Sequence, residues 1–268
     1  NEFQQHAPSR DDGFAQRVTR LTQPESMNTA RYIYGTVAVD GRDAWALFCA
    51  CAAGDLARVR DLLQRDPNLV NAQYWYQFPI HMAVREGHAD VVQMLLEEGA
   101  DPGQSRYTYN SWDKLLAVAE DRDLRAVRKL LQTAMSERFA YDERFEPLAV
   151  AIRDRDRQRI DALLAETPEL VKAADALGNN ALHWAALTRQ LDLIDHFHEL
   201  GADIDARRAD GRMPVHVAID GDYWYRPRDL PKDAIQDPWI VARHLLDRGA
   251  TCDLTMACRT GDVDRVGA

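Results

Sequence analysis

The sequence predicts an all-α fold built from stacked helix pairs. Three observations predict it: an internal period of about 34 residues, an apolar stripe with helical spacing in each period, and Pro and Gly residues where helices should begin and end. One helix pair cannot bury its own apolar stripe, so neighbouring pairs must stack and share a continuous core. The expected architecture is therefore an α-solenoid of helix–turn–helix units.

Paired leucines, or the residues that replace them, mark the period. The steps between successive pairs are 33, 35, 33, 34 and 48 residues, so the last step is one period plus an insertion. The pairs are Leu62–Leu63, Leu95–Leu96, Leu130–Leu131, Leu163–Leu164, Phe197–His198 and Leu245–Leu246. We expect one repeat domain over 41–268, with repeats at 41–73, 74–107, 108–141, 142–174, 175–207 and 208–252, an insertion at 222–238 and a partial repeat at 253–268.

The second half of each period predicts an amphipathic helix, and punctuating residues predict its limits. In the second repeat, Val91, Val92, Leu95 and Leu96 form one stripe. Glycine accepts the left-handed turn that ends a helix, and proline is tolerated in a first turn. The glycines expected at helix ends are Gly99, Gly201 and Gly249, and the prolines expected at helix starts are Pro79, Pro147 and Pro214.

The second repeat resembles the ankyrin repeat. Residues 78–101 read FPIHMAVREGHADVVQMLLEEGAD and are similar to the family signature of Thr-Pro-Leu-His, a central Gly, Leu-Leu and a final Gly-Ala-Asp. Residues 178–190 and 210–222 resemble the opening of that signature. The resemblance implies inner helices on a concave face, outer helices on a convex face, hairpin fingers along one edge, and binding of other proteins.

Two repeats depart from the signature. The third lacks the proline and histidine, and the fourth has Ala149 in place of the histidine. Arg122 and Arg155 stand where the glycine between the two helices is expected. We therefore expect irregular hairpins in this part of the chain.

Both ends of the chain differ from the repeats. Residues 1–40 are expected to form an N-terminal tail and a capping helix, because Phe14, Val18 and Leu21 fall on one helical face. The alternation in RYIYGTVAV, which starts at Arg31, indicates strands or an irregular first hairpin. The last repeat stops in mid-pattern at Ala268, so we expect the native gene product to continue.

Composition favours an ordinary globular chain and disfavours nucleic acid as a partner. The chain of 268 residues is 46% hydrophobic, carries a formal charge of -10 and intersperses acids with bases. That charge mildly favours a partner with a basic patch. No apolar run is long enough for a membrane span. The four cysteines suggest no disulfide framework, so a cytoplasmic location is expected. Because the sequence begins with Asn1 and not with Met, a leader peptide that has been removed is left as an alternative.

No catalytic, cofactor-binding or metal-ligating residue is predicted. His81, His183 and His216 recur at the repeat spacing, which is too long for a shared metal, and are expected to tie each hairpin to its neighbour. His196 and His198 are two residues apart on a helix and point to different faces. Acidic residues occur in runs typical of solvated surfaces.

Aromatic residues are the main candidates for contacts with a partner, because Trp and Tyr bury much area at low entropy cost. The fingertip candidates, which either bind or pack between fingers, are Tyr74, Trp75, Tyr76, Tyr107, Tyr109 and Trp112. The groove candidates are Trp184, Met82 and Arg85, together with Glu86, Arg153, Asp154, Leu187 and Thr188. In the insertion, Tyr223, Trp224 and Tyr225 either contact a partner or a second copy, or fold back.

Two functions are compatible with these features. The first is a scaffold that binds another protein through its concave face and hairpin fingertips. The alternative is a regulatory or targeting arm of a larger enzyme whose catalytic part lies beyond residue 268. A self-contained enzyme or small-ligand sensor would need a closed pocket, which the repeat pattern does not indicate. The partner and the oligomeric state are not specified by the sequence.

Overall fold

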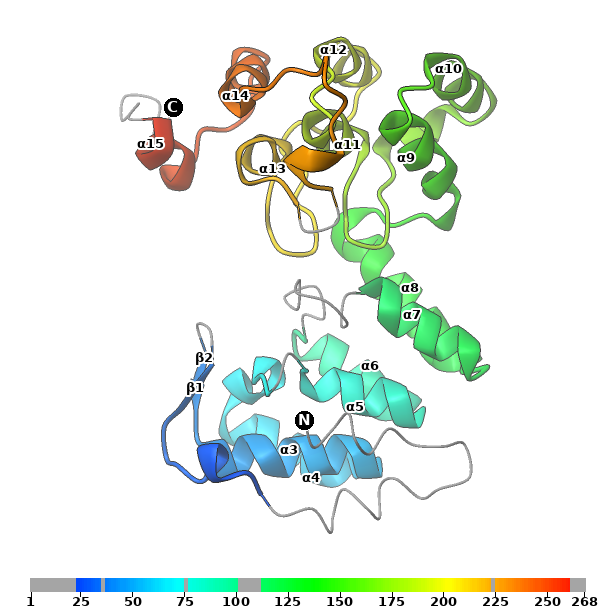
Figure 1. The fold of residues 1–268 in the computed structure, drawn as a ribbon. Helices are drawn as coiled ribbons and strands as arrows, with labels where there is room; N and C mark the ends of the chain where they lie inside the picture. The colour runs from blue at the N-terminus through cyan, green and yellow to red at the C-terminus, as the bar shows by residue number, and fades with distance from the viewer. Residues whose placement is uncertain (1–22, 35–36, 75–76, 101–111, 223–224, 261–268) are drawn as a thin grey trace. The chain divides into compact units, whose positions relative to one another are not determined.

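The computed structural model describes residues 23–34, 37–74, 77–100, 112–222 and 225–260, and shows a mostly helical chain (Figure 1). Two compact units divide it, Asn1–Ala134 and Met135–Ala268. The boundary falls inside α8 (Arg125–Phe139).

Unit 1 begins with a short turn and a two-stranded ribbon. The 3-10 turn η1 (Glu25–Met27) precedes β1 (Tyr32–Tyr34) and β2 (Val37–Val39), which pair antiparallel with Tyr32 opposite Val39. The ribbon confirms the strand pattern expected after Arg31. The capping helix expected from Phe14 to Leu21 lies outside the described residues.

Helix pairs make up the rest of unit 1. Helices α3, α5 and α7 contact one another in succession, and α4 and α6 pack behind α3 and α5. Their bounds are α3 (Gly41–Ala53), α4 (Leu56–Arg65), η2 (Pro67–Asn71), α5 (Pro79–Glu86), α6 (Ala89–Glu97) and α7 (Trp112–Asp121).

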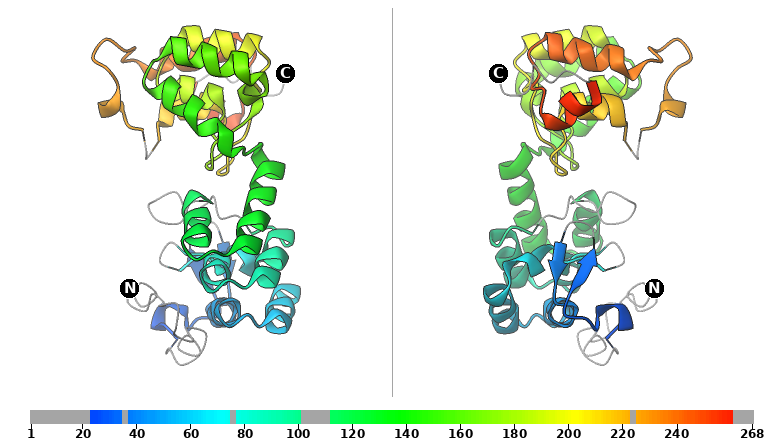
Figure 2. Two further views of the ribbon diagram at one scale, coloured as in Figure 1. Left: turned by 90° about the vertical axis from the view of Figure 1, so that its right-hand side faces the viewer. Right: turned by 90° about the vertical axis from the view of Figure 1, so that its left-hand side faces the viewer.

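Unit 2 stacks its helices in two layers. The inner layer is α9, α11 and α13, and the outer layer is α10, α12 and α14, as two directions of view agree (Figures 1 and 2). The bounds are η4 (Glu143–Phe145), α9 (Glu146–Arg153), α10 (Arg157–Glu166), η5 (Pro168–Lys172), α11 (Ala181–Leu187), α12 (Leu191–Glu199), α13 (Pro214–Asp220), η6 (Pro227–Asp229), α14 (Pro238–Asp247) and α15 (Leu254–Thr260).

One apolar core runs through the layers of unit 2. It extends from Phe145 through Leu182 and Phe197 to Val241 and Met256, so every helix pair of the unit contributes to it. This continuity is what stacking predicts, because each pair covers the stripe of the next. Each range expected for a complete repeat holds two helices in the described residues; the total of seven repeats stays a prediction.

The expected helix limits are confirmed. Pro79 and Pro214 open α5 and α13, and Pro147 is the second residue of α9. The glycines expected at helix ends all adopt the left-handed conformation, with φ of 90° at Gly99, 88° at Gly201 and 96° at Gly249. Local chemistry therefore sets most helix boundaries.

The turns between paired helices contain an unusual set of left-handed residues. Arg155 and Arg189 adopt φ of 59° and 57°, although only glycine does so without strain. Arg155 confirms the expected glycine replacement. Arg122 does not occupy the glycine position, which corrects that expectation. The left-handed residue there is Asp123, with φ of 53°. The helical turn extends one residue further than expected, because the N–H of Arg122 still donates to the carbonyl of Val118.

None of the helices in the described part of the chain is long and apolar enough to cross a membrane.

Candidate functional site

Three histidines fasten the starts of inner helices. The Nδ1 atoms of His81, His183 and His216 accept the backbone N–H three residues earlier, at 3.0, 3.2 and 3.1 Å. In His183 the proton must then lie on Nε2, which donates to the carbonyl of Arg212 in the next hairpin at 3.0 Å. Burial lowers the pKa of His183 to about 3, so its ring stays neutral. The expected hairpin tie is confirmed at His183.

The fingertip candidates are only partly visible. Tyr74 is buried, and its ring lies edge-on to Trp45 with 6.0 Å between ring centres, so packing is its role in this structure. Trp112 opens α7, and nothing is described of its side chain. The remaining fingertip and insertion candidates lie outside the described residues: Trp75, Tyr76, Tyr107, Tyr109, Tyr223 and Trp224.

Several groove candidates are covered rather than open. Met82 is fully buried because α5 lies between α3 and α7. Leu187 and Thr188 are also buried, and the hydroxyl of Thr188 donates back to the carbonyl of Trp184 at 2.7 Å. The expectation that these three side chains line an exposed groove is therefore corrected. Arg85 is partly exposed at the end of α5, beside Glu86.

Trp184 lies beneath other side chains. It is 4% exposed, and its Nε1 donates to Oδ2 of Asp175 at 2.9 Å. The Cζ atom of Arg153 stands 4.7 Å from the centre of the indole, and the ring of Tyr225 meets it edge-on at 6.4 Å. The expectation of an open indole surface is corrected. The reason is that the insertion folds back, which is the alternative that the sequence left open for Tyr225.

Two arginines fasten the turns at the ends of inner helices to segments further along the chain. Arg155 donates from Nη2 to the carbonyl of Thr188 at 2.6 Å. Arg189 donates from Nη1 to the carbonyls of Ile235 and Gln236, at 2.8 and 2.5 Å. These bonds link successive repeats and hold the C-terminal end of the insertion.

Arg153, Arg155 and Arg189, with the hydroxyl of Tyr225 among them, are called the arginine cluster from here on. Burial raises the pKa of Tyr225, and the negative charge of Asp229 adds to that rise. The positive charges of the three arginines act in the opposite direction. The three guanidinium groups therefore lie within electrostatic reach of one hydroxyl. All four side chains are partly exposed, so the cluster is a polar surface feature next to the covered Trp184.

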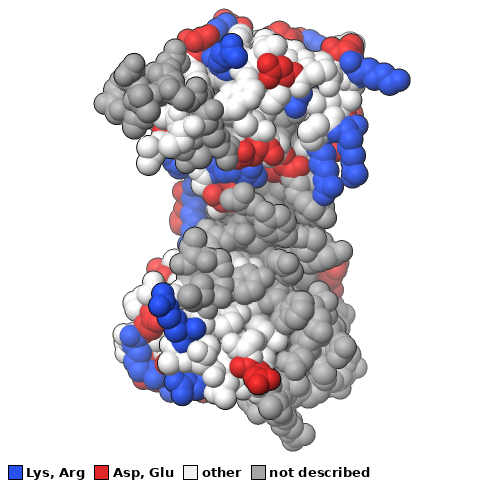
Figure 3. Space-filling model, turned by 60° about the vertical axis from the view of Figure 1, so that its left-hand side comes forward, with Lys and Arg blue, Asp and Glu red and all other residues white. Residues whose placement is uncertain are grey.

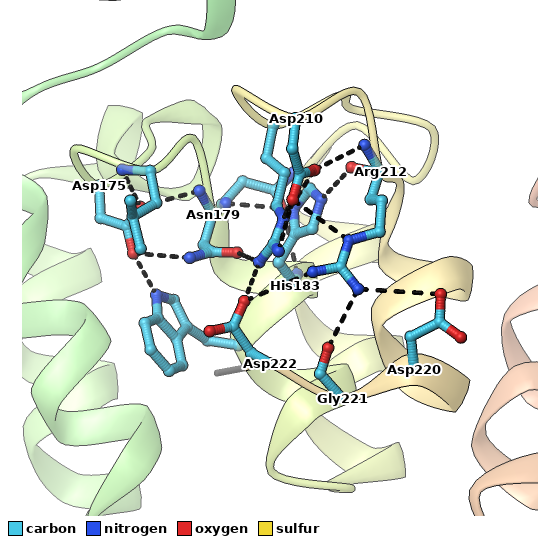
Figure 4. A network of polar contacts seen from close by, with 12 residues as sticks. Asp175, Asn179, His183, Asp210, Arg212, Asp220, Gly221 and Asp222 are labelled. Carbon is cyan, nitrogen blue, oxygen red and sulfur yellow. Dashed lines mark hydrogen bonds and ion pairs between the residues drawn. The ribbon is translucent and has the colours of Figure 1, made fainter. Parts of the chain in front are cut away.

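A buried polar network joins the hairpin before α13 to α11 and to the start of the insertion (Figure 4). Arg208 is 5% exposed and donates to Asp210, Asp222 and Asn179. Arg212 donates to Asp210 and to the carbonyl of Gly221. Burial lowers the pKa of Arg208, but bonds and charges from Asp210 and Asp222 outweigh it, so its pKa is raised.

Asp175 is the far end of this network. It accepts the backbone N–H of Leu177 and Asn179 at 2.8 and 2.9 Å, besides the indole N–H of Trp184. Burial raises the pKa of Asp175 to about 6, and the hydrogen bonds partly oppose that rise. The network fixes the hairpin and the root of the insertion relative to α11.

Surface ion pairs occupy many other charged groups. On outer helices, Arg58 pairs with Asp61 at 2.7 Å and Arg157 with Asp161 at 3.0 Å. On the face drawn in Figure 3, acidic and basic side chains lie side by side on both units. Among the described residues, no group of three or more His, Cys, Asp or Glu side chains could hold a metal ion.

Sequence reasoning missed the buried network. Arg208, Asp210 and Asp222 look like ordinary loop charges, and no spacing rule distinguishes them from exposed ones. The sequence could have indicated Arg155 and Arg189, because an arginine at a glycine position between two helices brings a long hydrogen-bond donor to a turn. The glycine replacement was predicted at Arg155 and not at Arg189.

Comparison with known families agrees with this fold. A profile of ankyrin repeats in three copies matches residues 26–111, and an ankyrin-repeat profile matches residues 177–206. Together with the stacked helix pairs, these matches define the chain as an all-α protein that contains ankyrin repeats.

Individual relatives are distant or short. Palmitoyltransferase AKR1 of Lachancea kluyveri is 24% identical over 212 residues, 64% of this chain and 28% of that protein. Human transient receptor potential cation channel subfamily A member 1 is 21% identical over 219 residues, 78% of this chain and 18% of that protein. Serine/threonine-protein kinase VIK of Arabidopsis thaliana is 52% identical over 48 residues, 18% of this chain and 11% of that protein.

The chain thus spans 28% or less of these three relatives. Among solved structures, a chain from the complex of the predatory endopeptidase Bd0816 of Bdellovibrio bacteriovorus with immunity protein Bd3460 is 24% identical, with a TM-score of 0.31. That match covers 76% of this chain and 97% of the other.

Proposed function

We propose that this chain is a protein-interaction scaffold that binds another protein through its inner helix layer, its hairpin fingers and the insertion that covers Trp184. The ankyrin repeats carry this proposal, since such repeats generally mediate protein–protein interaction. A surface held by a continuous core loses little conformational entropy on binding, which favours affinity.

The insertion supports an interaction role for unit 2. It interrupts the repeat between α13 and α14, yet it is fixed at both ends, by Arg208 and Arg212 at Asp222 and Gly221 and by Arg189 near Gln236. A segment that is ordered at its roots and exposed at Arg228 is a preorganised contact surface.

Selection from a displayed random-peptide library tests the proposal without a known partner. The intact chain is immobilised, and enriched peptides are mapped by hydrogen–deuterium exchange. We expect protection in α11, α13 or the hairpins that precede inner helices. Protection confined to α10, α12 and α14, or no enrichment over a scrambled library, would contradict the proposal.

A double substitution tests the fingertip part of the proposal. Trp75→Ala with Tyr76→Ala should weaken binding of the selected peptides more than it lowers the melting temperature. The matched control is Arg159→Ala with Arg243→Ala, two exposed residues of α10 and α14. A large loss of stability with intact binding would assign the two aromatics to packing.

The alternative is that the chain acts as the regulatory or targeting arm of a larger enzyme. The matched relatives support it to the extent that they include a palmitoyltransferase and a protein kinase. The sequence of the gene downstream of Ala268 separates the two functions. A catalytic domain there favours the arm, and further repeats favour a scaffold.

A further inference from the structure

We infer that the arginine cluster of unit 2 binds a carboxylate of the partner, so that the bound segment presents an Asp or Glu side chain to Arg155, Arg189 and the hydroxyl of Tyr225. This inference rests on the proposed function, because the carboxylate belongs to the partner protein.

Two cations of the cluster, Arg155 and Arg189, form no ion pair with a carboxylate in the part of unit 2 that the structure describes, although the charge of Asp237 acts on Arg189. Arg153 pairs with Glu146 at 2.8 Å, and Arg208 pairs with Asp210 at 2.7 Å. Arg155 and Arg189, in contrast, donate to backbone carbonyls and to no carboxylate among the described residues. A carbonyl satisfies a hydrogen bond but does not neutralise the positive charge, and both guanidinium groups lose solvent through partial burial.

The cluster also has donors to spare. A guanidinium carries five N–H groups, and Arg155 uses only Nη2 while its Nε is buried without a partner. Arg189 uses only Nη1. The hydroxyl of Tyr225 makes one long bond of 3.4 Å to the carbonyl of Asp229. A carboxylate accepts from several donors at once, and arginine is the side chain best suited to it.

The surroundings explain how these two positive charges are accommodated without an ion pair among the described residues. At Arg189, burial lowers the pKa and the negative charge of Asp237 partly opposes that change. Arg155 and Arg189 follow the C-terminal ends of α9 and α11, where helix carbonyls carry partial negative charge. The carbonyl of Thr188, at the end of α11, orients the guanidinium of Arg155, and the carbonyls of Ile235 and Gln236 orient that of Arg189. The guanidinium of Arg153 is held over the buried indole of Trp184. The cluster is therefore held in place before any ligand arrives, which lowers the entropic cost of binding.

The net charge of the chain favours the arginine cluster as the place where an acidic side chain of the partner binds. The whole chain is acidic, with a formal charge of -10, which favours basic groups over most of a partner. An acidic side chain on such a partner is repelled elsewhere and attracted at the arginine cluster. The cluster would thus set the register of the bound segment rather than supply most of its affinity.

The test uses peptides selected by the intact chain as the probe. Each enriched peptide is synthesised with its acidic residue as Asp or Glu and again as Asn or Gln, and both are titrated by fluorescence polarisation. For the unmodified chain we expect the amide form to bind about 10-fold more weakly. For Arg155→Gln with Arg189→Gln, and separately for Tyr225→Phe, we expect that difference to shrink to about 2-fold or less.

The controls separate charge from folding. Arg159→Gln with Arg243→Gln removes the same charge from outer helices and should keep the full difference. Tyr225→Phe deletes only a hydroxyl and leaves the carbonyl bonds of both arginines, so it stays informative if the double arginine variant is unstable. Circular dichroism melting curves identify such instability.

The outcomes distinguish this inference from the proposed function. Selected peptides that bind inner helices but carry no acidic residue, or an amide penalty that is equal in all variants, would overturn the inference alone. A phosphoserine in place of the acid that binds far more tightly than Glu would overturn the assignment of a carboxylate. Failure to select any peptide would overturn the proposed function and this inference together.

Discussion

Trp184 and Asp175 are joined by a hydrogen bond of 2.9 Å between the indole Nε1 and the carboxylate Oδ2, and both side chains are buried. Asp175 belongs to the hairpin before α11 and Trp184 to the helix itself. The bond therefore fixes the hairpin against the inner layer, and it lies directly under the cover formed by Arg153 and Tyr225. Stability of this region should depend on the protonation of one carboxyl group.

The first prediction concerns Asp175. Its pKa in the folded chain is about 6, above the ordinary value near 4, so the folded state holds a proton that the unfolded state has released. The contribution of this group to stability is complete below about pH 4 and is lost as the pH rises to about 6, by about 2 to 3 kcal/mol. Because His183 titrates in the same window with the opposite effect, the quantity to measure is a difference: the unfolding free energy of the native chain minus that of Asp175→Asn should fall by this amount from pH 4 to 7 in urea unfolding. Parallel pH profiles would contradict the prediction.

The second prediction concerns His183 and has the opposite sign. Burial lowers its pKa to about 3, so below about pH 6.5 the unfolded chain binds a proton that the folded chain excludes. The contribution of His183 to stability should fall as the pH decreases through this window, by about 3 to 5 kcal/mol at its acid end. His183→Gln should be less stable at pH 7, because it loses the bond to the carbonyl of Arg212, yet should lose less on acidification. The measurement is the unfolding free energy at pH 7, 5.5 and 4.5, and an unchanged slope would count against it.

The third prediction concerns Arg208. Its replacement by Ala leaves the buried Asp210 and Asp222 with Arg212 alone, at 3.2 and 3.8 Å, and this loss of the closer cation should destabilise unit 2 by about 3 to 5 kcal/mol in chemical denaturation. Arg207→Ala is the matched control, since Arg207 is exposed and, within the described residues, its side chain donates a hydrogen bond to the carbonyl of Gly211 rather than to a buried carboxylate. Its cost should stay below about 1 kcal/mol. Equal costs for the two variants would show that the network contributes little.

The fourth prediction concerns Arg189. Its φ of 57° suits glycine, while its guanidinium holds the carbonyls of Ile235 and Gln236. Both Arg189→Ala and Arg189→Gly lose those bonds, but only Gly relieves the backbone strain, so Ala should be less stable than Gly by about 1 kcal/mol. Limited proteolysis should cut near Gln236 faster in both variants than in the native chain. Ala as stable as Gly would show that the turn carries no strain.

Much of the fold could be predicted because its signals are local. Pro79 and Pro214 open helices, and Gly99 and Gly249 end them, through their own backbone geometry. The stripe that contains Val91 and Leu95 predicts which side of α6 is buried. These properties depend on residues within one turn or one helix, which a single sequence displays directly.

The candidate site was predicted less well because its contacts cross repeats. Arg155 reaches a carbonyl 33 residues away, and Arg189 reaches one 46 residues away. Trp184 was placed on the correct helix, but the residue that covers it, Tyr225, arrives from the insertion. Met82 was assigned to a groove although α7 covers it. Which side chain covers another depends on stacking between helix pairs, and repeat spacing alone does not contain that information.

The fastening of the insertion at its two roots has a consequence for engineering. Residues such as Pro227, Arg228, Lys232 and Asp233 are exposed between fixed ends, so their identity is decoupled from the helices that carry them. Such a segment can be diversified, lengthened or replaced by a foreign recognition sequence while the framework stays intact. The sixth helix pair is therefore a natural grafting position for new specificities.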